Sequence, residues 1–487
     1  MSILKNLFKD TALYGIGKSF QKFIGIFLLP LYATVLTPED FGVLDTIGVS
    51  TFFFIAILNL GLDSASGRFF FSAKTEDEKG KILFTTLVIR LITLIPILIL
   101  ACFSSQISVL LFNDSSYKWL VLVSILIIPM NVMYSDQENI FRYYFESYKY
   151  NQITIFKVIF SAASGLFLVI YLNYGAFGAV LSSFISFSIS LFITFYFFNK
   201  KRYVFHFSWE WAKKLINYGL PLIWATAAIW FYSSSDRYII LHFHNLTEVG
   251  IFSISSKIVQ VLAMLNIAIQ MSFGPHMVNN YEQDKTTNKL KSKNFMSDSW
   301  HVFLYVSITI IIVLSIFCPN IILFMLNEEY LTASLAVPFL GFSKILSQSI
   351  QMATPGILLK NKTKYFGIIL PICAFLNIII NFILIPRFGF TGAAFSTFLI
   401  HVLQFSILFF ISQKLLYVDY KILLSSLYIL IGILISIIIP LYEIFSIFKF
   451  SILQKTLICI IASVTPMFII NFSFGNFFKV LTNRSRR

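Results

Sequence analysis

Fourteen apolar segments, each about as long as a membrane-spanning helix, run through this chain between short polar or Gly/Pro-containing breaks. A helix needs roughly 20 apolar residues to cross the hydrocarbon core of a bilayer. The chain of 487 residues is 57% hydrophobic and 12% charged, which is too little polar surface to cover a soluble protein of this size. We therefore expect an all-α integral membrane protein with about 14 transmembrane helices. The segments lie near residues 10–36, 41–62, 82–112, 117–141, 152–173, 176–198, 211–243, 249–279, 298–326, 330–359, 365–385, 390–412, 421–441 and 452–475.

The basic residues predict the orientation of these helices. Lys and Arg resist translocation and accumulate in cytoplasmic loops. If the N-terminus is cytoplasmic, most of the 37 Lys and Arg residues fall in cytoplasmic segments, so we expect both termini in the cytoplasm. The formal charge of +15 is then a topology signal rather than a nucleic-acid surface, because no soluble domain presents it. Arg68, Arg90 and Lys157 lie close to the cytoplasmic ends of their spans, where we expect them to act as interface anchors.

An internal repeat predicts how the helices are grouped. Residues 173–183 recur as residues 387–397, and two Gly, one Ala and one Ser coincide at an offset of 214. A weaker echo links Thr37–Gly42 to Thr247–Gly250. Both members of each pair enter or leave the membrane from the same side, which indicates parallel repeats about an axis along the membrane normal.

The repeat predicts two six-helix lobes in a parallel pseudo-two-fold arrangement, followed by a pair of C-terminal helices. We expect an N-lobe at 1–205, a C-lobe at 206–415, and helices 13 and 14 with a basic cytoplasmic tail at 416–487. Such lobes imply a substrate path between them that opens alternately to each side. No loop is long enough to fold as a catalytic domain, so we expect a transporter with no catalytic residues, cofactor or metal site.

Several segments resemble a known family. Tyr218–Leu222, Asp236–Tyr238 and Glu248–Ile258 resemble the Wzx-type O-antigen and polysaccharide flippases of the MOP (MATE-like) exporter superfamily. Thr37–Gly42 and Leu60–Phe70 look like the first two helices of that family, and the resemblance covers nearly the whole chain. It implies a MATE-like fold that flips an undecaprenyl-pyrophosphate-linked oligosaccharide, an O-antigen or related surface polysaccharide unit, across the bacterial inner membrane. The implied partners are this lipid-linked cargo, membrane lipids, a coupling proton or sodium ion, and polysaccharide polymerase or assembly proteins, with no nucleic acid.

Five intramembrane cations are candidate contacts for the pyrophosphate of such a cargo. Lys18 and Lys22 are four residues apart, so they share one helix face, and an anion would relieve their repulsion. The alternative is that both reach the headgroups. Arg237 is the candidate in the second lobe, with a salt bridge as the alternative, and Lys257 and Lys344 are the deepest cations there.

Acidic residues inside spans are candidates for ion coupling, since buried carboxylates in transporters carry protons or bind sodium. We single out Asp45, Asp63 and Asp236. Asp136 and Glu138 are further acidic residues within a span. Interfacial solvation is the alternative for Asp45, Asp63 and Glu138, because these lie toward the ends of their helices.

Two other functions remain open. A MATE-type drug or cation antiporter would favour acidic rather than basic cavity residues. A membrane O-antigen polymerase or ligase would need a sizeable outward loop for its catalytic residues, and a topology map would reveal one.

Overall fold

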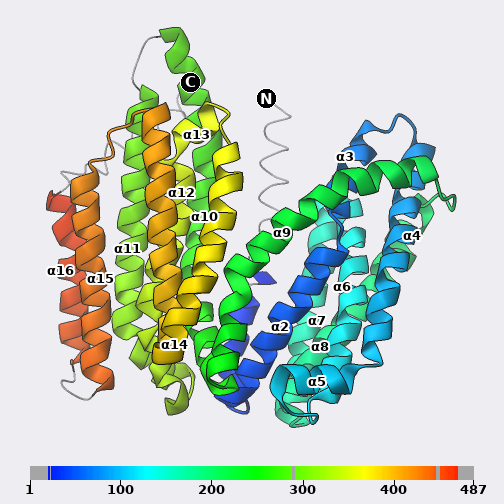
Figure 1. Ribbon diagram of the computed structural model, residues 1–487, viewed down its shortest axis with the longest axis horizontal. Coiled ribbons are helices and arrows are strands. Elements are labelled where there is room, and N and C mark those ends of the chain that lie inside the picture. The colour runs from blue at the N-terminus through cyan, green and yellow to red at the C-terminus, as the bar shows by residue number, and fades with distance from the viewer. Residues whose placement is uncertain (1–19, 22, 288–290, 446–449, 470–487) are drawn as a thin grey trace. The chain divides into compact units, whose positions relative to one another are not determined.

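The computed structural model describes residues 20–21, 23–287, 291–445 and 450–469, which form helices and connecting turns with no strand among them (Figure 1). The all-α fold is therefore confirmed. The α-helices are α2 (Pro38–Leu58), α3 (Leu62–Ser72), α4 (Glu76–Ala101), α5 (Ser104–Phe112), α6 (Lys118–Tyr143), α7 (Ser147–Leu166), α8 (Gly175–Ile193), α9 (Trp209–Phe243), α10 (Leu246–Thr287), α11 (Lys291–Met325), α12 (Val337–Ala353), α13 (Pro355–Leu359), α14 (Lys364–Leu415), α15 (Ile422–Ile444) and α16 (Ile452–Ile469). A short apolar helix, Phe23–Ala33, precedes them.

Helices cover most of each predicted span that the structure describes, although the spans 41–62 and 82–112 are each divided between two helices. Within that part of the chain, nine helices are long and apolar enough to cross a membrane. A tenth span arises if Glu328–Leu335 and Val337–Leu359, bent by 46° at a short break, are taken together. The 52-residue α14 contains two predicted spans, which meet at a kink at Gly389, where the backbone is not helical (φ 55°, ψ −138°). About 14 helices are compatible with this arrangement.

The chain divides into two compact units, Met1–Arg237 and Tyr238–Arg487. In the first unit, α6 is central and packs against α2, α4, α5, α7 and α8. In the second unit, α12 packs against α10, α11 and α14, and α11 also contacts α15 and α16. The expected lobe boundaries near residues 205 and 415 lie in the non-helical stretches 203–208 and 416–421.

The repeated glycine motif forms the same tight turn in each unit. Gly175 has φ 53° and Gly389 has φ 55°, a left-handed region that favours glycine. One turn later, a Cβ atom at Gly178 would lie 3.0 Å from the Leu168 carbonyl carbon, and one at Gly392 would lie 2.7 Å from the Leu384 carbonyl oxygen. The first glycine therefore permits the turn, and the second lets the following helix pack against the preceding one.

In both units, an acidic residue of the weaker repeat lies beside this glycine turn. Asp40, in the first turn of α2, has its carboxylate 4.0 Å from the Cβ position of Gly175. Glu248, in the first turn of α10, faces Gly389 and accepts a hydrogen bond from the backbone N–H of Phe390 at 2.9 Å. The two motifs detected separately in the sequence thus lie side by side within each unit. This pairing supports a common origin of the two halves.

Gly389→Ala is expected to destabilise the second unit by about 1–3 kcal/mol. Gly389 has φ 55° and ψ −138°, and an added Cβ would overlap the Glu248 carboxylate. The thermal unfolding temperature of the purified protein in detergent measures the effect. Gly367→Ala on the same helix is the matched control, since nothing lies within 4 Å of its Cβ position. Equal unfolding temperatures for the two variants would show that the turn carries no strain.

Candidate functional site

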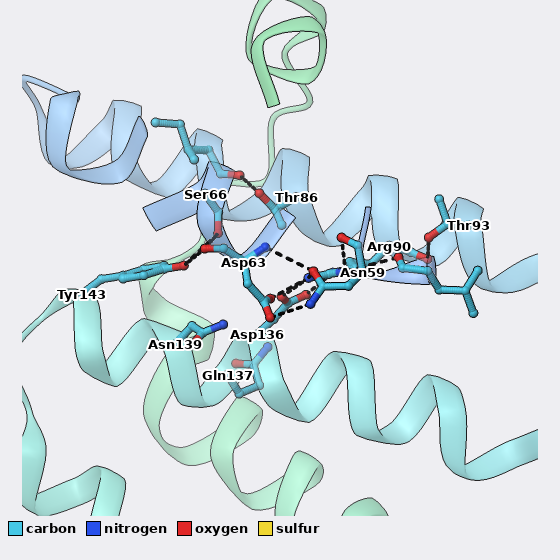
Figure 2. A network of polar contacts seen from close by, with 12 residues as sticks. Asn59, Asp63, Ser66, Thr86, Arg90, Thr93, Asp136, Gln137, Asn139 and Tyr143 are labelled. Atoms are coloured by element: carbon cyan, nitrogen blue, oxygen red, sulfur yellow. Dashed lines mark hydrogen bonds and ion pairs between the residues drawn. The ribbon is translucent and has the colours of Figure 1, made fainter. Parts of the chain in front are cut away.

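A fully buried arginine lies at the centre of a polar network in the first unit. Arg90 on α4 has 0% of its surface exposed. Its guanidinium forms a two-point ion pair with Asp136 on α6, with Nε to Oδ2 and Nη2 to Oδ1 both at 2.9 Å. Figure 2 shows the two side chains meeting between their helices. A planar guanidinium matches a carboxylate in this geometry, so the pair fixes α4 against α6.

The same guanidinium also contacts Asp63 and Asn59 (Figure 2). Nη2 lies 2.8 Å from Asp63 Oδ1 and 3.1 Å from Asn59 Oδ1. The Asn59 amide donates to Asp63 Oδ2 at 2.7 Å, and the Asp63 backbone N–H donates back to Asn59 Oδ1 at 3.3 Å. One cation thus organises two carboxylates and an amide from two separate parts of the chain, residues 59–63 and Asp136.

The polar network around Arg90 lies at a break in the second predicted span and stabilises it. The span does not run straight through: α2 ends at Leu58 and α3 begins at Leu62, with left-handed φ values of 49° at Leu60 and 63° at Gly61. Helix ends leave carbonyl groups without partners, which is costly in a membrane. Arg90 Nη1 donates to the carbonyl oxygens of Leu58 at 3.3 Å and Asn59 at 2.8 Å. Its charge also suits the negative end of the α2 dipole.

Two carboxylates face one guanidinium, so the network has one more acidic group than basic groups. If all three groups were ionised, the site would carry a net charge of −1, and an uncompensated buried charge is costly. The side chain of Asp136 is 11% exposed and that of Asp63 is 32% exposed. A proton shared by this carboxylate pair would neutralise the site without disturbing the two-point bond to Arg90.

A small polar cavity adjoins Asp136. Its volume is about 10 Å³, at the lower limit for one water molecule. The residues that line it include Ser66, whose hydroxyl lies 2.8 Å from the hydroxyl of Tyr143. Its polar lining side chains are Ser66, Thr86, Asp136, Asn139, Tyr143 and Tyr203.

A second ion-pair cluster contains three of the predicted site residues. Arg237 Nε lies 3.0 Å from Asp45 Oδ2 of α2, and Nη1 lies 3.7 Å from Asp236 Oδ2. Nη1 also donates to the Ser233 carbonyl oxygen at 2.9 Å. The salt-bridge alternative for Arg237 is therefore present in the structure, formed within the first unit. Interfacial solvation is wrong as the main setting of Asp45, since its carboxylate is ion-paired and its side chain is 19% exposed.

The Arg237–Asp45 pair is expected to show a coupling free energy on the order of 2 kcal/mol in a double-mutant cycle, because both partners are largely buried. The cycle compares Asp45→Asn, Arg237→Gln and the double variant by thermal unfolding. Each single variant leaves one charge of this pair without its partner. The double variant removes both charges of the pair. Strict additivity would contradict the expectation. Wild-type transport by the double variant would show that the Arg237 charge serves the pair rather than the cargo.

The other four predicted cations belong to neither of these clusters as the structure describes them. Lys18 and Lys22 lie outside the described residues. Lys257 lies on α10 and is partly buried, and Lys344 lies on α12 with an exposed side chain. Both helices belong to the second unit, where they pack against each other. The structure thus gathers the carboxylates Asp45 and Asp236 with Arg237, and joins Asp63 to Arg90.

Sequence reasoning missed the role of two buried cations. Arg90 and Lys157 are not interface anchors, because they are 0% and 9% exposed. The Lys157 ammonium lies 4.1 Å from the ring centroid of Tyr134 and 3.9 Å from a carboxylate oxygen of Glu138. Interfacial solvation is likewise wrong for Glu138, whose side chain is 15% exposed. The side chain of Asp136 is 11% exposed. The sequence did contain a signal for such buried ion pairs, because opposite charges lie at similar depth in neighbouring predicted spans. Arg68 stays exposed, over the ring of Tyr218.

This chain is similar in sequence to known proteins. Residues 7–281, more than half of the chain, match the family model described as polysaccharide biosynthesis protein. Lsg locus protein 1 of Haemophilus influenzae is 22% identical over 369 residues, covering 74% of this chain and 85% of that protein.

Solved structures show the same fold. The lipid II flippase MurJ, in an inward closed conformation, matches with a TM-score of 0.71 at 16% identity, covering 98% of this chain and 100% of that one. A multidrug resistance MATE family transporter of the MOP superfamily, in an inward-facing conformation, matches with a TM-score of 0.65 at 13% identity. That match covers 81% of this chain and 94% of the transporter. The predicted MATE-like fold is therefore confirmed.

Proposed function

The chain belongs to the polysaccharide biosynthesis protein family, and from this premise we propose that it is a flippase for a lipid-linked oligosaccharide. The cargo is an undecaprenyl-pyrophosphate-linked repeat unit of an O-antigen or related surface polysaccharide, moved across the bacterial inner membrane by alternating access. The match of residues 7–281 to the family model is the observation that carries the proposal. The multi-pass fold shared with MOP exporters supports it. The protein then acts as a transporter, with no enzymatic step.

The pyrophosphate of this cargo requires cationic contacts, for which we propose Lys18, Lys22, Arg237, Lys257 and Lys344. Arg237 is bound to Asp45, so an anion would compete with that carboxylate. Lys257 and Lys344 are the other two described residues of this proposed set. Their helices, α10 and α12, pack together in the second unit.

Coupling to an ion gradient is proposed at the carboxylates Asp45, Asp63 and Asp236. Asp63 is the strongest of these, because it shares one guanidinium with Asp136 and is the more exposed of the two. A proton is the ion best suited to this pair. Uptake of a proton would leave one negative charge opposite Arg90, which is the balanced state. We place both termini in the cytoplasm and propose polysaccharide polymerase or assembly proteins as partners.

Deletion of the gene in its native bacterium tests the function. The lipid-linked oligosaccharide is expected to accumulate on the inner leaflet and the surface polysaccharide to disappear, both restored by the wild-type gene. Lys344→Gln should restore less than the control Lys364→Gln, whose residue begins α14 and is exposed. Normal surface polysaccharide in the deletion strain would overturn the proposal. Increased sensitivity to cationic drugs instead would favour a MATE-type exporter, which the MATE fold also allows.

A further inference from the structure

A cavity of about 510 Å³ lies within the first unit, apart from the ion-pair clusters. Its walls come from the helix Phe23–Ala33 and from α2, α6, α7 and α8. This volume falls in the range of about 300–1,000 Å³ that is typical of small-molecule sites.

The described residues that line this cavity are uncharged and mostly apolar. It presents six neutral hydrogen-bonding side chains: Tyr32, Thr51, Asn131, Ser161, Ser182 and Ser183. The rest of the described lining is apolar and includes the rings of Phe52 and Phe187. A phosphate would meet no described counter-charge here, and such a site would leave an anion poorly solvated.

Some of the polar side chains that line the cavity have no hydrogen-bond partner among the residues that the structure describes. Ser182 and Ser183 donate their hydroxyls to the carbonyl oxygen of Ala179, at 2.8 and 3.2 Å. The side chains of Asn131 and Thr51 make no hydrogen bond to any other described residue. Amide and hydroxyl groups in a membrane protein are costly without partners, so a ligand or water must satisfy them.

A glycine shapes one wall of the cavity. A Cβ atom at Gly165 on α7 would overlap the Tyr32 hydroxyl and would lie 3.3 Å from the Ser182 hydroxyl. Gly165 therefore lets the Tyr32 hydroxyl lie close to α7, beside Ser182, on a wall shared with the cavity. Gly48 of α2 also lines the cavity, and nothing lies within 4 Å of its Cβ position.

We propose that this cavity is a subsite for an uncharged sugar ring of the cargo, an inference that rests on the proposed flippase function. Sugar hydroxyls donate and accept hydrogen bonds, which matches the amide and hydroxyl groups of the lining. The apolar face of a sugar ring packs against aromatic rings such as Phe52 and Phe187. An isoprenoid chain would offer no hydrogen bond to the Asn131 amide or the Thr51 hydroxyl, which disfavours it as the occupant. The pyrophosphate then binds elsewhere, at the cations.

Binding measurements with two probes test this subsite. The first probe is the lipid-linked oligosaccharide extracted from the deletion strain, and the second is undecaprenyl pyrophosphate without sugar. The full-length protein is purified in detergent as wild type, as Gly48→Leu, which fills the cavity, and as Asn131→Leu, which removes its amide. Gly367→Leu is the control, because its Cβ position is also open but lies on α14.

Wild-type protein and Gly367→Leu are expected to bind the sugar-bearing probe more tightly than the bare one. Gly48→Leu and Asn131→Leu should weaken sugar-probe binding by about tenfold and leave bare-probe binding unchanged. Unchanged sugar-probe binding in both cavity variants would overturn the subsite while the flippase proposal stands. Weaker binding of the bare probe by Gly48→Leu would assign the cavity to the isoprenoid and also overturn it. If wild-type protein binds neither probe, the proposed function itself fails.

Discussion

Arg90→Ala is expected to destabilise the protein by about 3–5 kcal/mol, the cost of removing one partner from a buried ion pair. The variant leaves Asp136 and Asp63 facing each other without their cation. It also removes the donors to the carbonyl oxygens of Leu58 and Asn59 at the end of α2. A large fall in unfolding temperature should follow, measured in detergent by the loss of monodisperse protein on heating.

Two further variants make this expectation specific. Lys81→Ala on the same helix removes a pair with Asp77 whose side chains are 33% and 58% exposed, and it should have little effect. The unfolding temperature of Arg90→Lys should lie between those of Arg90→Ala and Lys81→Ala, because an ammonium group cannot form the two-point bond to Asp136. Similar unfolding temperatures for Arg90→Ala and Lys81→Ala would contradict a central role for the network.

Gly219→Ala is expected to cost about 3 kcal/mol, at the upper end for overpacking, and to abolish transport. An added Cβ at Gly219 of α9 would overlap the carbonyl oxygen of Leu60 at the break between α2 and α3. A Cβ at Gly61 would in turn lie 2.5 Å from the Gly219 carbonyl oxygen. In both contacts the added Cβ meets a backbone carbonyl oxygen, so rotation of a side chain cannot relieve the overlap. The helix α9 must therefore move away from the break.

The consequence is measured by unfolding temperature and by restoration of surface polysaccharide in the deletion strain. Gly367→Ala controls for the loss of a helical glycine, since its Cβ position is open, and alanine is the better helix former. Full restoration by Gly219→Ala at a wild-type unfolding temperature would show that the close approach of the two glycines is dispensable.

Hydropathy predicted the helices well because each span satisfies its own backbone hydrogen bonds, so segment composition alone decides its position. The Gly-x-x-Gly repeat was also visible in the sequence, because a left-handed turn such as that at Gly389 restricts the residue type. The break at Leu60 and Gly61 was not predicted. It depends on Arg90 and Gly219, which are distant in the sequence and supply the tertiary contacts.

The candidate site was harder to predict, since sequence supplies charged residues but not their partners. Asp63, Asp45 and Arg237 were recognised as functional candidates. Arg237 lies 192 positions from Asp45, and Arg90 lies 46 positions from Asp136, so no local pattern reveals either pair. Depth in the membrane was judged from distance to a loop, which misplaced Arg90 at the interface. Packing against neighbouring helices buries it instead.

The most direct measurement is flipping of the lipid-linked oligosaccharide in vesicles that contain only the purified protein. The lipid from the deletion strain is reconstituted in both leaflets, and membrane-impermeant periodate oxidises the sugars that it can reach. A flippase is expected to expose nearly all of the sugar to oxidation, whereas vesicles without protein protect the inner-leaflet share. If vesicles with the wild-type protein protect the same share as protein-free vesicles, the chain does not flip this lipid.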